Sequence, residues 1–318
     1  LGRERAPPAR GMQQSGHEVP MSPAWPTLEI PHWRDTRETL HRDAQIVGKL
    51  QLATTPRVSH FWNVALRMTA RGLATAALSH DDRTFDIELD FVDHVLVVRS
   101  SEGERSELPM RDCSVAEFDA ELMDALASIG VRVPIRHEPV ELASEAIPFR
   151  EDRQHHVYDR EWVGRFWHAL LQSERVLAAF RARFVGKASP VGFYWGTFDL
   201  CAARYSGARV PHPPPGTIER EAFSHEVSEA GVWPGDARYD QPAFFALHAP
   251  TPEGYAQAHV EPAGASWCAA MSCFLLPYER ARTSASPESA LLEFFETTYA
   301  AGATLARWNR DELERHAA

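Results

Sequence analysis

One pattern occurs twice in this chain and constrains its fold more than any other feature. Residues 47–71 begin with Val-Gly-Lys, continue to an aromatic residue followed by tryptophan, and end at an arginine nine residues after that tryptophan. Residues 185–204 repeat the same order. The two occurrences begin at residues 47 and 185, and this spacing is far longer than the ~20–50 residues of a solenoid repeat. We therefore expect an α+β fold made by internal duplication of a helix–antiparallel sheet–helix unit, with a pseudo-two-fold axis between the copies.

Hydrophobic periodicity predicts the elements of each copy. The first copy covers residues 27–135 and the second covers residues 158–310. In the first copy we expect helices over 35–52 and 114–130, and strands over 61–70, 84–91 and 95–98. In the second copy we expect helices over 162–180 and 286–305, and strands over 192–205, 244–249 and 271–278. Two helix starts rest on capping-box spacing, Asp35 with Glu38 and Ser114 with Glu117.

Three segments lack this periodicity. Residues 1–26 are rich in Pro, Gly and Arg, so we expect a disordered tail, with Met12 or Met21 as alternative start residues. Residues 136–157 are predicted to connect the two copies. Residues 207–243 are predicted to form a long loop of the second copy that has no counterpart in the first. A loop of this length in a compact protein is usually either functional or disordered.

Charge and hydropathy argue against several classes of function. The 318 residues include 33 Lys and Arg against 44 Asp and Glu, a net charge of −11, which argues against nucleic acid or a membrane surface as the main partner. No apolar run approaches the ~20 residues that span a bilayer. The four cysteines have no C-x-x-C spacing, so we expect reduced thiols and a cytoplasmic protein. No motif specifies a cofactor or a partner protein.

Several stretches resemble a bacterial family that is catalogued only as a domain of unknown function. They are ARGL (70–73), GKASPV through WGTFDL (186–200), SHEVSEAGVWPG (224–235) and LLPYE (275–279). The resemblance extends over nearly all of residues 25–310, and it implies a fold shared with uncharacterised proteins but no activity. Asn63 and Gly192 stand where that family has histidine, which argues against a metal site built on those two strands.

A histidine–glutamate pair is the candidate for catalysis. His225 and Glu226 lie in the predicted loop, and an imidazole beside a carboxylate suits proton transfer or metal binding. The second histidine of a zinc-binding H-E-x-x-H helix is missing, because Glu229 stands there. His60 could meet His225 if the loop folds back, which makes this pair a weak candidate for holding an unknown metal. The alternatives are a loop-ordering histidine and a half-buried histidine at a strand end.

The repeated cations form the candidate ligand site. Arg71, Lys187 and Arg204 could bind a carboxylate or a phosphate, which would make the ligand an anionic small molecule. Asp199 lies between apolar neighbours in a predicted strand and needs a cationic partner, which Arg204 or Lys187 would supply. The structural alternative is a set of ion pairs across the sheet.

Two functions from different classes follow. The first is a small-molecule-binding protein or enzyme, with a pocket between the copies that Trp195 and Trp233 line and the predicted loop covers. The second is a non-catalytic protein-interaction module with a tryptophan-rich face. An enclosed pocket lined by His60, His225 and Arg204 would favour the first function. Exposed tryptophans without an enclosed polar pocket would favour the second.

Overall fold

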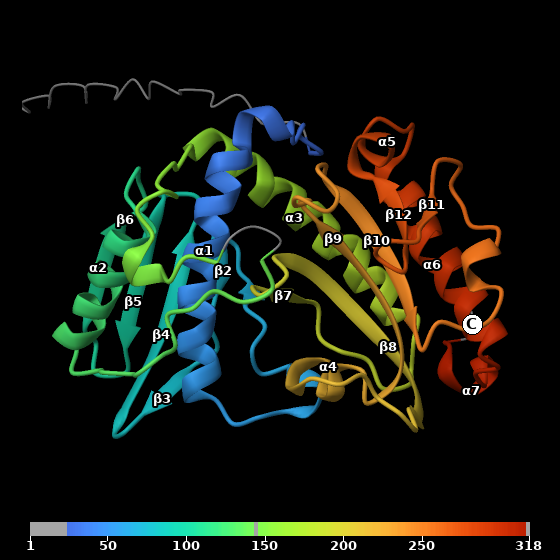
Figure 1. Cartoon of the computed structure of the whole chain (residues 1–318), viewed down its shortest axis with the longest axis horizontal. Helices are drawn as coiled ribbons and strands as arrows, with labels where there is room; N and C mark the ends of the chain where they lie inside the picture. The colour runs from blue at the N-terminus through green and yellow to red at the C-terminus, as the bar shows by residue number, and fades with distance from the viewer. Residues whose placement is uncertain (1–23, 143–145, 316–318) are drawn as a thin grey trace, which may run out of the picture.

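Two antiparallel sheets form the framework of the molecule (Figure 1). The computed structural model describes residues 24–142 and 146–315. The strands of the first sheet are β1 Arg67–Met68, β2 Gly72–Ala74, β3 Leu78–His80, β4 Arg83–Asp90, β5 Val95–Ser100 and β6 Arg105–Pro109. The strands of the second sheet are β7 Gly192–Tyr194, β8 Asp199–Arg209, β9 His225–Trp233, β10 Ala243–Ala249, β11 Ser266–Cys268 and β12 Cys273–Pro277.

Helices pack against both sheets, so the predicted α+β class is confirmed. Those in the described part are α1 Ile30–Thr54, α2 Val115–Ser128, α3 Arg160–Ala182, α4 Thr217–Ala222, α5 Tyr278–Arg282, α6 Pro287–Leu305 and α7 Arg310–Leu313. Helix α1 packs against α2 and α3, and α3 packs against α6. The main hydrophobic core runs through both halves and includes Trp33 of α1, Phe166 of α3 and Phe295 of α6. The two halves are therefore not separate globular units.

The two sheets meet at their first strands. The first sheet has the order β1-β2-β4-β5-β6, with β3 paired to β4, and the second has the order β11-β12-β10-β9-β8-β7. Leu66, just before β1, and Phe193 of β7 form an antiparallel bridge with two backbone hydrogen bonds of 2.9 Å each. The first strand of one half thus lies beside the first strand of the other.

Local sequence signals predicted several elements well. Helix α2 begins at a complete capping box, in which the side chains of Ser114 and Glu117 each accept from the other residue's backbone N–H. Helix α6 begins at Pro287, as its fixed φ favours. The hairpin of β4 and β5 turns at His94, which has a left-handed φ of 55°.

Three predicted element bounds are wrong. The strand over 61–70 is only β1, because His60 and Phe61 adopt left-handed φ values of 60° and 58° in a 3-10 turn. The strand over 192–205 is divided into β7 and β8 by a turn at Phe198, with φ 63°. Helix α1 begins at Ile30 with proline in its first turn, so Asp35 and Glu38 lie inside it and do not cap it.

The long loop predicted over 207–243 is also wrong, because this segment contains α4 and β9. Strand β9 pairs with β8 on one side and with β10 on the other, so it is central in the second sheet. Its sequence shows no regular alternation of apolar and polar residues, since side chains on both of its faces are covered. Central strands of this kind lack the two-residue period on which strand prediction depends.

The repeated sequence pattern does not occupy equivalent places in the two halves. Residues 47–49 (Val-Gly-Lys) lie inside α1, whereas residues 185–187, with the same sequence, follow the end of α3. Arg71 lies just before β2, whereas Arg204 lies within β8. The similarity of the two segments therefore does not reflect a shared local structure.

Part of the predicted disordered tail is ordered, and the predicted connector contains little regular structure. Residues 1–23, with both candidate start methionines, lie outside the described residues. Trp25, in the last part of the predicted tail, is buried and packs edge-on against Phe244 with ring centroids 6.1 Å apart, so disorder is wrong there. The described residues of the connector, 136–142 and 146–157, contain only the 3-10 turn Phe149–Glu151 as regular structure.

Candidate functional site

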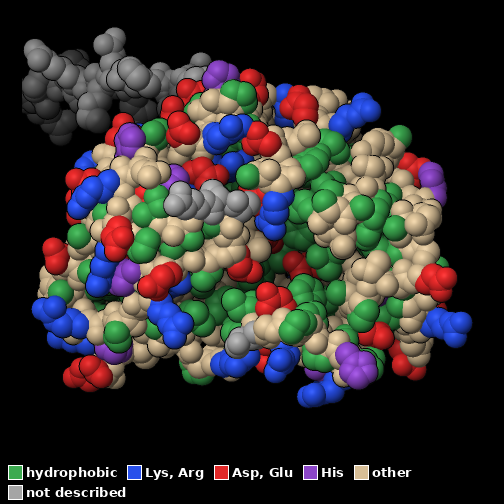
Figure 2. All heavy atoms as spheres, in the orientation of Figure 1, with side chains coloured by type: hydrophobic (Ala, Val, Ile, Leu, Met, Phe, Trp, Pro, Cys, Tyr) green, Lys and Arg blue, Asp and Glu red, His purple; other side chains and the backbone are tan. Residues whose placement is uncertain are grey.

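A cavity of about 230 Å³ lies between the two halves. Leu52, His60 and Phe61 of the first half line one side, and Glu141 of the connector reaches in beside them. The second half contributes its sheet and helix α4, and its lining residues are Tyr194, Trp195, Gly196, Thr197, Asp199, Cys201, Ala203, Tyr205, Ile218, Glu219, Ala222, Phe223 and Glu229. Figure 2 shows a hollow between the halves with hydrophobic side chains gathered around it.

The backbone of β8 sorts its side chains between the cavity and the core. Successive residues of a strand point to opposite faces. Asp199, Cys201, Ala203 and Tyr205 line the cavity, whereas the intervening apolar residues join the core that α3 covers. Antiparallel pairing places Glu229 of β9 opposite Ala203, so its carboxylate reaches the same face.

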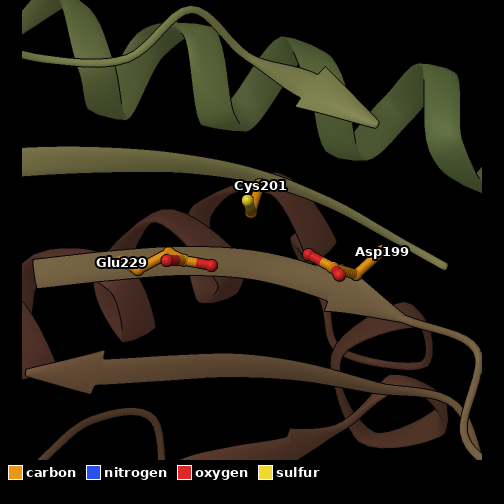
Figure 3. A group of neighbouring side chains, drawn as sticks. All are labelled: Asp199, Cys201 and Glu229. Carbon is orange, nitrogen blue, oxygen red and sulfur yellow. The ribbon is translucent and has the colours of Figure 1, made fainter. Parts of the chain in front are cut away.

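Two carboxyl groups and a thiol meet at one end of this face. The carboxyl oxygens of Asp199 and Glu229 and the Sγ of Cys201 lie within 4.8 Å of one another. Figure 3 shows the two carboxyl groups pointing toward one another from β8 and β9. The hydroxyl of Thr197 donates to Oδ1 of Asp199. No lysine or arginine of the described chain forms an ion pair with either carboxyl group.

Burial shifts the proton equilibria of this cluster. Asp199 is only 6% exposed, and burial, reinforced by the charge of Glu229, raises its pKa from 3.8 to about 7. Burial also raises the pKa of Glu229 and that of the Cys201 thiol. A carboxylate that loses its water without gaining a cation retains its proton. Near neutral pH the cluster is therefore poised to ionise when a cation arrives.

The same three groups offer ligand atoms for a divalent metal. Carboxylate oxygen and thiolate sulfur are both common ligands of zinc, and three protein ligands with an open fourth position are typical of catalytic zinc sites. Asp199, Cys201 and Glu229 would supply two oxygens and one sulfur next to an open cavity.

Aromatic rings cover much of the remaining wall. Trp195 is buried, and its indole N–H donates to the carbonyl of Val64 at 2.8 Å, which fixes the ring. Tyr194, Tyr205 and Phe223 add further rings around the cavity. Burial raises the pKa of Tyr194 well above 10, so its phenol stays neutral. Rings of this kind suit the apolar body of a ligand or a cation held over a ring face.

A cluster of imidazoles and a lysine lies at the other end of β8. The Nζ of Lys187 donates to Nε2 of His60 at 2.8 Å and lies 5.4 Å from the ring centre of Tyr205. The His60 ring stacks on Tyr205 with centroids 4.3 Å apart, and the His225 ring lies 5.3 Å from it. The Nδ1 of His60 donates to the carbonyls of Glu221 and Ala222 at 3.2 and 3.1 Å.

These contacts fix the protonation state of His60. Its Nε2 accepts a hydrogen bond from Lys187 and its Nδ1 donates, so the ring is the neutral Nδ1–H tautomer. Burial, together with the charge of Lys187, lowers the pKa of His60. Burial and the same lysine lower the pKa of His225. The two imidazoles of this cluster are therefore neutral near pH 7.

Some of the residues predicted for the site line the cavity or lie next to it. Trp195 and Asp199 line the cavity, and Lys187 touches two of its lining residues. His60 and His225 lie side by side, as the folded-back segment predicted. Trp233 lines a smaller neighbouring cavity of about 30 Å³.

Three other candidates lie away from the main cavity. Arg204 points to the opposite face of β8, where it pairs with Glu296 at 3.2 Å. Arg71 pairs with Asp90 and with Asp93 at the β4–β5 turn, in the first half. Glu226 accepts from the hydroxyl of Ser206 at 2.7 Å and is not among the lining residues.

Sequence reasoning missed Cys201 and Glu229, which form the acidic end with Asp199. Cys201 could have been found, because a strand beginning at Asp199 places residues 199, 201, 203 and 205 on one face. Glu229 could not, because its segment was predicted to be a loop. Tyr194 and Tyr205 carried no signal beyond aromatic character.

Comparison with known proteins assigns a family but no activity. A family model described as a family of unknown function, DUF5996, matches residues 25–315. No curated protein matches the chain, and no solved structure matches it. Among the residues that the structure describes, no helix is long and apolar enough to cross a membrane.

Proposed function

We propose that this chain, which belongs to the DUF5996 family of unknown function, binds a small organic cation in the cavity between its two halves. The observation that carries the proposal is the pair of carboxyl groups, Asp199 and Glu229, at the end of a cavity lined largely by aromatic rings. Within the described residues no lysine or arginine pairs with them.

A bound ammonium group would offset the repulsion between the two carboxylates and the cost of burying them. Two neighbouring carboxylates in a site of low polarity repel each other, and burial disfavours the ionised form of each. A ligand ammonium within hydrogen-bond distance would stabilise ionised Asp199 and Glu229 and satisfy their oxygens. The rings of Tyr194 and Trp195 would cover its carbon atoms and add cation–π attraction.

The tryptophans support a ligand site over a protein-interaction face. None of the nine tryptophans, all of which lie within described residues, is exposed. The cavity is lined by His60, although neither His225 nor Arg204 lines it. With no exposed tryptophan among the described residues, the cavity favours the ligand-binding hypothesis over the tryptophan-rich face.

Proton transfer at His225 remains a proposal for a catalytic version of this function. The lowered pKa of His225 leaves its imidazole neutral near pH 7, as a general base requires. Glu226 is a weak partner for it, because that carboxylate already accepts from Ser206. Asp199, with a pKa of about 7, is equally able to exchange a proton with a ligand inside the cavity.

Matched pairs of ligands would test the cation proposal. We would measure binding of primary amines with aliphatic or aromatic bodies, and of the alcohols of the same shape, by isothermal titration calorimetry. Amines should bind and alcohols should not, and Asp199→Asn or Glu229→Gln should weaken the amines. Glu226→Gln is the matched control, since it lies on the same strand outside the cavity. Equal binding of amine and alcohol would contradict the proposal.

A divalent metal is the second candidate, favoured by the 4.8 Å grouping of Asp199, Cys201 and Glu229. Elemental analysis of protein purified without chelator would decide it. Stoichiometric metal that is lost in Cys201→Ser and retained in His225→Ala would establish this cluster as the site. Metal that is lost in His225→Ala alone would place it at the two histidines, and metal-free parent protein titrated with zinc without binding would remove the candidate.

We infer an internal duplication from the order of the elements. Each half has a long helix, a six-stranded antiparallel sheet and a further helix, namely α1, β1 to β6 and α2, then α3, β7 to β12 and α6, with the short helices α4 and α5 added in the second half. The antiparallel bridge of Leu66 and Phe193 is compatible with a pseudo-two-fold relation between the halves. A cytoplasmic location in a bacterium is likewise our proposal, supported by four cysteines that are free thiols.

A further inference from the structure

We propose that the ligand is an elongated zwitterion, with its ammonium at Asp199 and Glu229 and an anionic group at its other end held by Lys187. The inference rests on the proposed function, because it uses the same cavity. It adds a second charge and a length to the ligand. The observations that carry it are the carboxyl pair at one end of the cavity and the Lys187 ammonium. Lys187 does not line the cavity, but its Nζ hydrogen-bonds His60 and lies near the ring of Tyr205, which both do.

The length follows from β8. Asp199 and Tyr205 both line the cavity and are six residues apart on one strand face. At ~3.4 Å per residue their Cα atoms are separated by roughly 20 Å. The Lys187 ammonium lies 5.4 Å from the Tyr205 ring, so it marks the far end. Because Glu229 pairs with Ala203, the two carboxyl groups meet between positions 199 and 203, and a ligand that reaches from them to Lys187 spans on the order of 10–15 Å.

Lys187 is held in place but is not neutralised. Its Nζ donates one hydrogen bond to His60 and lies 5.4 Å from the centres of both the Trp62 and Tyr205 rings. Within the described residues no carboxylate forms an ion pair with it. Glu221, whose backbone carbonyl accepts from His60, has its carboxylate paired with Arg57 at 3.2 Å. An ammonium with two remaining hydrogens is free to bind a carboxylate or phosphate oxygen.

The middle of the cavity specifies the body of the ligand. Cys201 and Ala203 of β8 line the cavity together with Ala222 of α4 and Phe223, the residue after it. These side chains offer no strong hydrogen-bond donors or acceptors. The polar groups of a peptide backbone placed there would lose their hydrogen bonds to water without gaining new ones. An aliphatic or aromatic body fits, and the class is therefore a long amino acid whose two charges lie at opposite ends.

Binding of a defined series would test this inference. The probes are ω-aminododecanoate, dodecylamine, dodecanoate and the shorter ω-aminobutanoate, all used below any micellar concentration. Calorimetry should give an affinity for ω-aminododecanoate about fivefold to tenfold above that for dodecylamine. The short amino acid cannot span the two ends and should bind more weakly than either.

Lys187→Met tests whether Lys187 binds the anionic end of the ligand. The substitution keeps most of the hydrocarbon stem of an exposed residue and removes the ammonium. It should abolish the preference for ω-aminododecanoate and leave dodecylamine unchanged. Arg183→Met is the control, since it removes one exposed cation that pairs with Glu296 at 3.7 Å outside the cavity. Melting temperatures would verify that both variants fold.

The outcomes separate this inference from the proposed function. Equal affinities of the amine and the amino acid for the parent protein, or a preference that survives Lys187→Met, would overturn the zwitterion and leave the cation site standing. Loss of all amine binding in Asp199→Asn together with loss of the preference in Lys187→Met would support both. Failure of every amine to bind the parent would overturn both.

Discussion

The indole ring of Trp195 rests directly on Gly48 of α1. A Cβ atom at position 48 would lie 2.2–2.3 Å from three atoms of that ring, so only glycine allows this contact. The same indole is fixed by its hydrogen bond to Val64 and lines the cavity. The contact joins the first half of the chain to a wall of the site in the second half.

Gly48→Ala should therefore lower both stability and ligand binding. The added methyl group must displace the indole, and overpacking of this kind costs about 1–3 kcal/mol. Gly164→Ala in α3 is the matched control, because nothing lies within 4 Å of its added Cβ. There the better helix propensity of alanine should raise stability by about 0.5–1 kcal/mol. Urea unfolding of both variants would measure this, and equal effects would contradict the packing argument.

Asp199→Asn should change how stability depends on pH. In the unfolded chain Asp199 ionises near 3.8, but in the folded protein it keeps its proton to about pH 7. Between these values the folded state binds more protons, so the parent loses stability as pH rises and then levels off above about 7. The variant lacks this loss, which amounts to a few kcal/mol at most. Urea unfolding at several pH values would show it, whereas parallel curves would refute it.

Amine affinity should rise with pH through the ionisation of Asp199. Because the pKa of Asp199 is about 7, much of the carboxyl group is protonated at pH 6 and must release its proton when an ammonium binds. The affinity should increase by about tenfold for each unit of pH below 7 and flatten above it. Calorimetry in buffers of different ionisation enthalpy would also detect the released proton. An affinity independent of pH from about 5 to 8 would rule out this coupling.

Arg204→Met should damage the fold without affecting the cavity. Arg204 is 1% exposed, donates to the carbonyl of Phe180 and pairs with Glu296 at 3.2 Å. Removing one partner of a buried ion pair costs about 3–5 kcal/mol, and the loss is smaller where the remaining charge reaches water, as Glu296 does. Ligand affinity of the folded fraction should equal that of the parent. Weakened binding at full folding would instead return Arg204 to the ligand site.

Predictability from sequence differed between local and long-range features. The capping box at Ser114 depends on a few neighbouring residues, and it was predicted correctly. Strand β9 was missed because its two covered faces remove the alternating pattern. The acidic end of the cavity was missed for the same reason, since Glu229 reaches Asp199 only through the register of β8 with β9. Pairing register is a property of the folded sheet, which a single sequence does not display.

The bridge between Leu66 and Phe193 also protects the molecule from self-association. An unpaired strand at the edge of a sheet is a template for pairing with another chain. Here the two short first strands cover each other, so neither sheet has an open edge at that place. A chain divided within the connector would expose both of these edges together with the shared core. We expect such fragments to aggregate or to reassemble with each other, because neither half retains a complete interior.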